Sequence, residues 1–202
     1  MKNEYIFTAL LIICAAGLAF PQSNPVGQSN FLVGGKLYFQ SQTGEAYEDE
    51  EGESTTTISI NPDLGIFFAD GFYLGAAAEM QSIDIGKKRR LEYSIGPRIG
   101  YFYNSDKYRE DNQGALFPYA TIYFTYGEFQ DHDEFEFNYV KTSIGINLGV
   151  VKMISPALGL DIGLKISHDT FEVKGENLAG MDGVTVRLGV GLVGFFGKRF
   201  NL

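Results

Sequence analysis

The 202-residue sequence predicts an all-β protein: an eight-stranded antiparallel up-and-down transmembrane β-barrel, preceded by a cleavable signal peptide. Two observations lead to this fold class. Several segments of roughly ten residues alternate large apolar side chains with small or polar ones, which is the period of a β-strand. The N-terminal segment has the pattern of an export signal. The composition agrees, because 17 Phe, 12 Tyr and 25 Gly are typical of an aromatic-rich β protein whose strands bend at glycines.

The first 19 residues form the predicted signal peptide. Lys2 precedes an apolar run of roughly 15 residues, which is too short for a membrane-spanning helix of about 20. Gly17-Leu18-Ala19 fits a small-x-small cleavage pattern, so the cleavage site is placed approximately after Ala19. Residues 20–29 then form a short N-terminal segment, and residues 30–202 form the barrel. The only cysteine, Cys14, lies within the signal, so we expect no disulfide or thiol chemistry in the mature chain.

The first four strands are predicted where large apolar residues alternate with mostly small or polar residues, such as Gly, Ser, Asn, Asp, Lys, Glu, Gln and Arg. Their apolar members are, in chain order, Phe31, Val33, Leu37 and Phe39; Ile58, Ile60, Leu64, Ile66 and Phe68; Phe72, Leu74, Ala76, Ala78 and Met80; and Leu91, Tyr93, Ile95, Ile99 and Tyr101. Each set holds its parity across the segment, so one face of each strand is apolar.

The last four strands show the same pattern, most clearly in Leu158–Ser167 (LGLDIGLKIS). Their apolar members are Ala120, Ile122, Phe124 and Tyr126; Val140, Ile144, Ile146, Leu148 and Val150; Leu158, Leu160, Ile162, Leu164 and Ile166; and Val184, Val186, Leu188, Val190 and Leu192. No segment has a convincing helical period.

The connections between these strands alternate in length. Long, mostly charged connections are predicted at Gly44–Ser54, Ile83–Arg90, Glu128–Glu136 and His168–Gly183, and tight turns at Ala69–Gly71 and Met153–Pro156. Asn104–Gly114 breaks the alternation because it is long where a tight turn is expected. Barrels of this type have long loops outside and short turns in the periplasm, so we expect four external loops and periplasmic termini.

The apolar face meets either a soluble protein core or lipid. In a soluble sandwich or ligand-binding barrel the second face would meet water, and it would be unusually poor in charge and rich in glycine. In a membrane barrel that face fills the lumen, which side chains can fill when there are eight strands. The second interpretation also explains aromatic residues near strand ends as interfacial girdles. The residues assigned to these girdles are Tyr73, Tyr93, Tyr101, Tyr103, Phe117, Tyr126 and Phe196.

Charged residues share the face assigned to the lumen. Asp161 and Lys165, four positions apart, are one example. The full set is Lys36, Asp63, Glu79, Glu92, Arg98, Lys141, Asp161, Lys165 and Arg187. Isolated charges in a narrow lumen would be costly, whereas paired charges are tolerated. We therefore expect an ion-pair network that plugs the barrel, although charges near the strand ends could instead meet water.

No motif indicates catalysis, a cofactor or a metal. The acidic run Gly44–Glu53 lacks the spacing of a Ca²⁺ loop, and His132 between two Asp residues is a weak metal signal. Ser167-His168-Asp169 is contiguous on an extended chain, so its side chains alternate sides and cannot form a triad. The basic run Lys87–Arg90 is predicted to lie in the second long loop. The net charge of −9 argues against a nucleic-acid partner.

Four stretches carry a family resemblance: Ile60–Glu79, Tyr93–Tyr103, Ala115–Gly127 and Leu148–Leu164. They include Asn-Pro on the second strand and Gly-Pro-Arg on the fourth. Together they resemble the outer-membrane β-barrel family common in Bacteroidetes, labelled porin-family or PorT-like, which is similar to small OmpA/OmpX-type barrels. One departure is the ending FFGKRFNL, since such barrels usually end in an aromatic residue.

The resemblance implies a location in the bacterial outer membrane, with outer-membrane lipid as the surroundings and no known active site. We expect a structural envelope role or a surface-interaction role without catalysis. The alternative is a membrane subunit of a larger assembly, such as a protein-secretion complex, with envelope or secretion proteins as partners. A narrow pore is the least expected function. The sequence does not define the oligomeric state.

Overall fold

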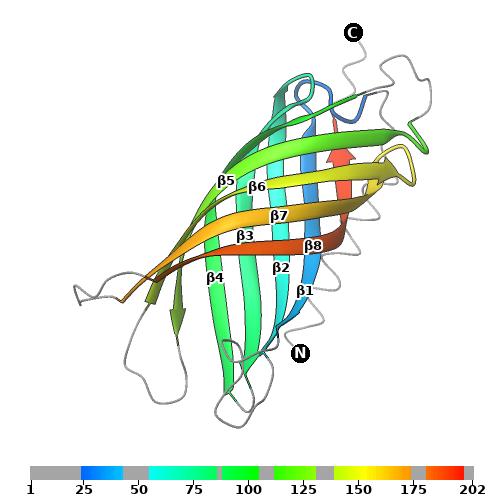
Figure 1. The fold of residues 1–202 in the computed structure, drawn as a ribbon. Coiled ribbons are helices and arrows are strands. Elements are labelled where there is room, and N and C mark those ends of the chain that lie inside the picture. Colours follow the sequence, from blue (N-terminus) through cyan, green and yellow to red (C-terminus); the bar gives the residue numbers. More distant parts are fainter. Residues whose placement is uncertain are drawn as a thin grey trace, which may run out of the picture.

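The computed structural model describes residues 24–42, 55–85, 88–104, 112–130, 139–173 and 181–197. These residues form a closed barrel in which each strand pairs with the next and β1 pairs with β8 (Figure 1). All the ladders are antiparallel, so this is the predicted up-and-down barrel. The strands are β1 (Phe31–Gln42), β2 (Thr55–Ala69), β3 (Phe72–Ile85), β4 (Lys88–Phe102), β5 (Leu116–Gln130), β6 (Tyr139–Met153), β7 (Leu158–Val173) and β8 (Met181–Phe196).

The described part of the chain contains no helix that is long and apolar enough to span a membrane. The predicted signal peptide lies outside the described residues.

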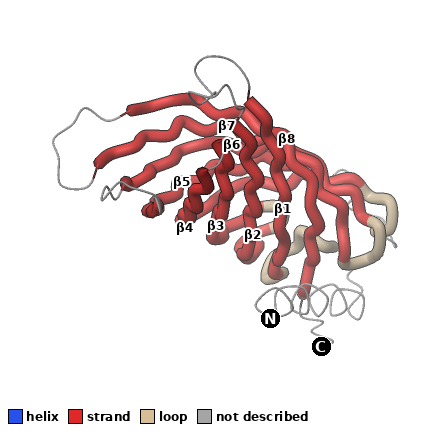
Figure 2. The backbone as a smooth tube through the Cα atoms, turned by 90° about the horizontal axis from the view of Figure 1, so that it is seen from below, coloured by secondary structure: helices blue, strands red, loops and turns tan. Residues whose placement is uncertain are grey.

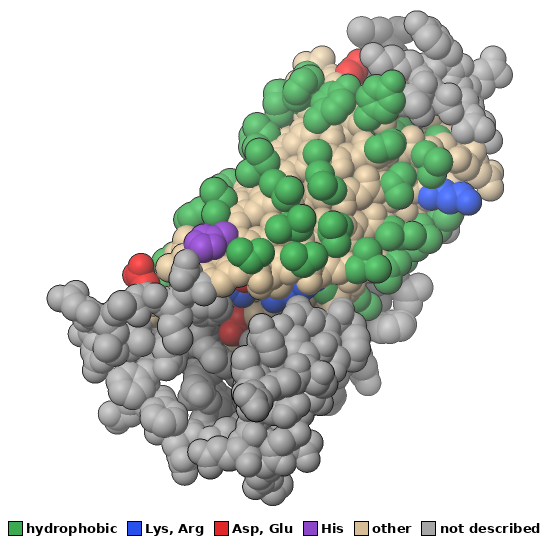
Figure 3. Space-filling view, in the orientation of Figure 1, with side chains coloured by type: hydrophobic (Ala, Val, Ile, Leu, Met, Phe, Trp, Pro, Cys, Tyr) green, Lys and Arg blue, Asp and Glu red, His purple; other side chains and the backbone are tan. Residues whose placement is uncertain are grey.

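The outward face of the barrel is a belt of large apolar side chains. Ile95 is 63% exposed, Ile122 56% and Leu188 67%, although each lies within a strand. Figure 3 shows hydrophobic side chains spread over the wall of the barrel, with the coloured charged side chains and the His at its margins. Water would not favour so large an apolar surface, whereas the hydrocarbon core of a bilayer does. The lipid-facing assignment of the apolar set is therefore confirmed for the described strands.

The strands are longer than their apolar alternation predicted, ranging from 12 residues in β1 to 16 in β7 and β8. The predicted long connection Ile83–Arg90 was wrong, because Ile83–Ile85 pairs directly with Lys88–Arg90. The basic run therefore lies largely in β4 instead of in a loop. Likewise β7 continues through Asp169 to Val173. The reason is that the alternation marks only the lipid-facing part of a strand, while backbone pairing continues into water with polar side chains.

Two aromatic residues assigned to the interfacial girdles lie inside the barrel instead. Tyr73 is 0% exposed and Phe117 is 1% exposed, whereas Tyr93, Tyr101, Tyr103 and Tyr126 do point outward. The reason is strand parity: Tyr73 shares its face with Gly75 and Glu79, and Phe117 with Tyr119 and Tyr123. Their position near a strand end is typical of an interfacial girdle, but it does not determine whether the side chain points to lipid or to the lumen.

The lumen at the tight-turn end is filled by an apolar cluster. We call this set the aromatic plug: Val26, Leu32, Phe67, Tyr73, Phe102, Ala115, Phe117, Tyr119, Val151, Met153, Val193 and Phe195. Phe67 lies at its centre, with ring centroids 5.4 Å from Phe102 and 6.2 Å from Phe195. The segment before β1 adds Val26, whose backbone oxygen accepts a hydrogen bond of 2.8 Å from Gly71 N. Figure 2, which views the strands from below, shows described loops joining strand ends.

The lipid-facing belt makes a depth-dependent prediction. Replacing Ile122, near the middle of β5, with Arg should lower the free energy of unfolding by about 2–4 kcal/mol, because a cation at the bilayer centre loses its hydration. The matched variant Leu116→Arg, at the first residue of β5, should cost about 0–1 kcal/mol near the interface. Urea titration in phospholipid vesicles measures both. Equal effects at the two positions would argue against a lipid-facing belt.

Candidate functional site

All nine charged residues predicted for the lumen point into the interior of the barrel, because side chains alternate between the two faces of each strand. Eight of them are between 6% and 9% exposed, and Asp63 has a side chain that is 15% exposed. They come from β1 to β4 and from β6 to β8, so the charges face one another across the lumen. The charged groups fall into a middle cluster next to the aromatic plug and an upper cluster nearer the loop ends of the strands.

The first half of the middle cluster joins β1, β5 and β7. Lys36 Nζ lies 3.0 Å from Asp161 Oδ2, and Tyr119 OH donates a 2.9 Å hydrogen bond to Asp161 Oδ1. Lys36 also donates to the Tyr119 oxygen and lies 4.7 Å from the centre of the Tyr119 ring. Tyr119 therefore belongs both to the aromatic plug and to the charged network.

The second half of the middle cluster joins β2, β3, β4 and β5. Arg98 forms an ion pair with Asp63, which also accepts a hydrogen bond from Tyr73 OH. Arg98 Nε donates a further hydrogen bond of 2.9 Å to Thr121 Oγ1. Tyr73 is thus a second aromatic residue whose ring packs in the plug and whose hydroxyl group binds a lumenal carboxylate.

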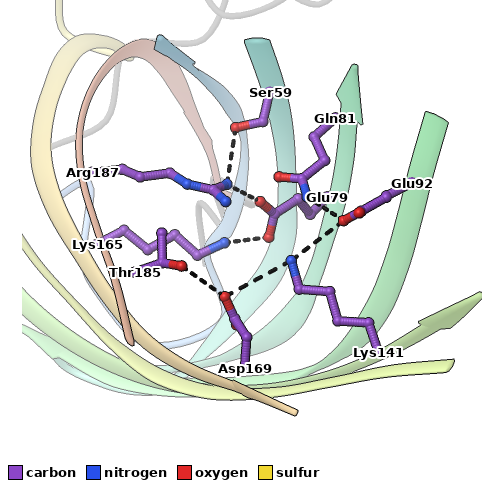
Figure 4. Close-up of polar contacts among 9 residues, drawn as sticks. All are labelled: Ser59, Glu79, Gln81, Glu92, Lys141, Lys165, Asp169, Thr185 and Arg187. Carbon is purple, nitrogen blue, oxygen red and sulfur yellow. Dashed lines mark hydrogen bonds and ion pairs between the residues drawn. The ribbon is translucent and has the colours of Figure 1, made fainter. Parts of the chain in front are cut away.

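The upper cluster is centred on Glu79 (Figure 4). Each of its carboxylate oxygens faces one cation, Lys165 Nζ at 2.5 Å and Arg187 NH1 at 2.5 Å. Arg187 also reaches Ser59 Oγ at 3.4 Å. These contacts link β3 directly to β7 and β8 on the opposite wall, as the converging side chains in Figure 4 show.

The remaining contacts of the upper cluster surround Lys141. Its ammonium group lies 3.5 Å from Glu92 Oε2 and 3.9 Å from Asp169 Oδ2. Glu92 also accepts a hydrogen bond from the Gln81 amide, and Asp169 accepts one of 2.9 Å from Thr185 Oγ1. Each carboxylate therefore has a cation and a neutral donor as partners, as a buried charge requires.

Among the described residues, Asp169 is a charged member of this network that the sequence analysis missed. The predicted strand ended at Ser167, so Asp169 was assigned to a loop, although it continues the parity of Asp161 and Lys165 at steps of four. Its inclusion gives equal numbers of opposite charges. The cations are Lys36, Arg98, Lys141, Lys165 and Arg187, and the carboxylates are Asp63, Glu79, Glu92, Asp161 and Asp169.

The weaker chemical candidates do not form a site in the described part of the chain. His168 is exposed on the outside of β7, whereas its neighbour Asp169 is 4% exposed inside, so the two side chains lie on opposite faces. Among the described residues, no three His, Cys, Asp or Glu side chains are placed to hold a metal ion. The acidic run Gly44–Glu53 and His132 lie outside the described residues.

The shared role of Tyr119 makes a prediction about its hydroxyl group. Tyr119→Phe keeps the ring in the plug but removes the donor to Asp161 and the acceptor of Lys36, so the free energy of unfolding should fall by about 1–3 kcal/mol. The same change at lipid-facing Tyr126, 49% exposed, serves as the control and should have little effect. Urea unfolding in vesicles measures both variants. A Tyr119→Phe protein as stable as the Tyr126→Phe protein would show that these hydrogen bonds contribute nothing.

Comparison with known proteins gives the fold of this chain. No family model and no curated protein matches the sequence. The crystal structure of Neisserial surface protein A superposes with a TM-score of 0.50 and 15% identity, over 82% of this chain and 96% of that chain. The crystal structure of the outer membrane protein OprG from Pseudomonas aeruginosa gives a TM-score of 0.51 and 10% identity, over 87% and 99%. At these identities the likeness concerns the fold alone. With the apolar belt, it confirms the predicted transmembrane β-barrel of outer-membrane type.

Proposed function

We propose that this protein is a small barrel of the bacterial outer membrane with a structural envelope or surface-interaction role, and that its lumen does not carry solutes. The observation that supports this most strongly is the double filling of the lumen. The aromatic plug occupies the tight-turn end, and the network of five cations and five carboxylates crosses the remainder. A barrel filled in this way offers its surroundings a lipid-facing wall and external loops.

Conductance across a planar bilayer tests the closed lumen. The purified protein should give no steady conductance, and enlarging the lumen at the plug with Phe67→Ala and Phe195→Ala together should raise the frequency of openings. The lipid-facing pair Phe68→Ala and Phe72→Ala is the matched control and should behave like the unchanged protein. A steady conductance of open-pore size in the unchanged protein would overturn the proposal in favour of a pore.

The surface-interaction role is supported by an analogy and by charge. One structural neighbour is named as a surface protein. In this chain the predicted first external loop, Gly44–Glu53, carries six carboxylates among ten residues. Such a loop would favour cationic partners at the cell surface. Removal of residues 45–53 should abolish retention of the intact cells on a cationic surface. Unchanged retention would argue against this role.

The proposal includes no catalysis and no cofactor. In its support, the buried charges are paired with one another, and His168 and Asp169 point to opposite sides of the wall. Activity toward ester or peptide substrates in the purified protein would contradict this part of the proposal.

A second candidate, membrane subunit of a larger outer-membrane assembly, is favoured by the connection between β4 and β5. This connection leaves the tight-turn end, where the other turns are short, and it is held at its base by a 2.8 Å hydrogen bond from Gly114 N to Met153 O. The PorT-like resemblance points in the same direction. Photo-cross-linking from position 107 in intact cells would capture a stoichiometric periplasmic protein if this candidate is right. Recovery of the barrel alone would favour the first proposal.

A further inference from the structure

A cavity of about 30 Å³ lies inside the barrel. Residues of the aromatic plug, such as Phe102, contribute to its lining, and Lys165 of the upper cluster does so as well. The four charged residues of the middle cluster also line it: Lys36, Asp63, Arg98 and Asp161. The cavity is therefore the place where the plug and the two charged clusters meet.

Two buried polar atoms of the lining residues, Asn61 Oδ1 and Tyr123 OH, have no hydrogen-bond partner among the described residues. Tyr123 is 4% exposed, and its hydroxyl group lies near Ser167 without making a hydrogen bond of normal geometry. An amide oxygen needs a donor, whereas a phenol hydroxyl group can both donate and accept. Because buried polar atoms are nearly always hydrogen-bonded, we expect a small molecule that donates and accepts beside these two atoms.

The two carboxylates that line the cavity are also the most accessible carboxylates of the described network. The side chains of Asp161 and Asp63 are 12% and 15% exposed. The other carboxylate side chains, those of Glu79, Glu92 and Asp169, are 7%, 7% and 6% exposed. Asp63 and Asp161 therefore keep surface that a molecule of the size of water can touch, although each is paired with a cation.

The charge and the size of the cavity determine which small molecule it suits. The three lining cations are each paired with a carboxylate: Lys36 with Asp161, Arg98 with Asp63 and Lys165 with Glu79. A bound anion or cation would add an uncompensated charge, which is unfavourable in a buried site. The volume excludes larger neutral solutes, because each water molecule alone needs about 10–15 Å³ of such space. The cavity therefore suits about two water molecules.

We propose that this cavity is an internal hydration site, in which about two water molecules bind to Asn61 Oδ1, to Tyr123 OH and to the carboxylates of Asp63 and Asp161. Tyr123 connects the site to the upper cluster, because its ring lies 4.8 Å from the Lys165 ammonium group. The water molecules join the middle cluster to the upper cluster, so that the lumenal charges form one continuous polar network. The aromatic plug separates this water from the tight-turn end.

Nuclear Overhauser transfer from water to the side-chain amide protons of Asn61 tests the hydration site, in isotope-labelled protein reconstituted in lipid nanodiscs. Bound water gives peaks of opposite sign in laboratory-frame and rotating-frame spectra, whereas direct proton exchange gives peaks of the same sign. The test variant is Ala77→Val, because Ala77 lines the cavity and two added methyl groups would displace the water. The matched control is Ala76→Val, on the lipid-facing side of the same strand.

The expected result is a water contact at Asn61 in the unchanged protein and in Ala76→Val, and its loss in Ala77→Val. No contact in the unchanged protein would overturn the proposal, since the cavity would then be dry. A contact that persists in Ala77→Val would overturn it too, because exchanging hydroxyl or ammonium protons would then be its source.

Tyr123→Phe keeps the proposal testable if Ala77→Val does not fold. The contact at Asn61 should persist in this variant, because the water keeps its other partners, and its complete loss would assign the signal to the phenol proton. A titration with sodium chloride separates water from ions. Chemical shifts at Asn61 that change and saturate with salt would assign the site to an ion and overturn the proposal, whereas unchanged shifts support it.

Discussion

Glu79→Gln should lower the free energy of unfolding by about 3–5 kcal/mol, the largest effect expected for one charge in this protein. Glu79 faces two cations, Lys165 and Arg187, both at 2.5 Å, and all three residues are buried. Glutamine keeps the shape of the side chain but removes its charge, so the positive groups of Lys165 and Arg187, which are paired residues on the adjacent strands β7 and β8, would lie side by side without the carboxylate that they share. The loss is larger than the worth of a surface ion pair, because buried cations cannot recover full hydration.

Equilibrium urea unfolding in phospholipid vesicles, followed by circular dichroism, measures this loss. The neighbouring residue Met80 points to lipid and is 58% exposed, so Met80→Leu is the matched control and should change the stability by less than about 1.5 kcal/mol. If Glu79→Gln proved as mild as Met80→Leu, the upper cluster would not stabilise the barrel. If Glu79→Gln failed to fold, Glu79→Asp would serve instead, with a smaller loss in the same direction.

Phe67→Ala should lower the free energy of unfolding by about 3–5 kcal/mol, because it leaves a cavity in the middle of the aromatic plug. The Phe67 side chain is 0% exposed and its ring contacts Tyr73, Phe102 and Phe195. These neighbours come from β3, β4 and β8, so the backbone of three strands would have to move inward to refill the space. Closed barrels resist such movement, because every strand is hydrogen-bonded on both sides over this region.

The adjacent residue provides the control for this prediction. Phe68 carries the same side chain on the same strand, but it faces lipid and is 47% exposed. In Phe68→Ala, lipid chains fill the space that the ring leaves, so no cavity remains. The loss of unfolding free energy should therefore be well under half of the loss expected for Phe67→Ala. The same urea titration compares the two variants. Similar losses at positions 67 and 68 would mean that the plug contributes no more than lipid contact does.

The sequence was sufficient to predict the number of strands, their order and their two faces, because every side chain that points to lipid has to be apolar. Alternation in segments such as Leu158–Ser167 is strong for that reason. The ends of the strands could not be predicted in the same way. Beyond the bilayer, Ile83–Ile85 and Lys88–Arg90 pair through backbone groups, which have no signature in the side-chain pattern. The same limit hid Asp169 from the predicted lumenal set.

The interior was predicted only in part, because its tight-turn end is filled by apolar rings and the rest of it by charged side chains. Charged residues at lumenal parity signal a polar interior, and the nine positions follow from parity alone. The aromatic plug was missed because the prediction assigned apolar residues to lipid and polar residues to the lumen. Phe67, Phe102 and Phe195 are apolar residues at positions that face the lumen, so they do not follow this pattern. Near the tight turns the lumen is sealed from water, so large rings fill it better than charges would. A search for apolar residues out of phase with the belt would have found these three.

The pairing of β1 with β8 also has a consequence for how the chain folds. The Phe31–Phe196 pair joins residues that are 165 positions apart, while the other ladders join neighbours along the chain. Contacts of such large sequence separation form late, since the entropy of closing the loop has to be met before they form. The ladder of β1 and β8 is also the shortest, with eight pairs against fifteen between β6 and β7. Barrel closure should therefore be the slow step of folding, and a nearly complete open sheet should accumulate before it.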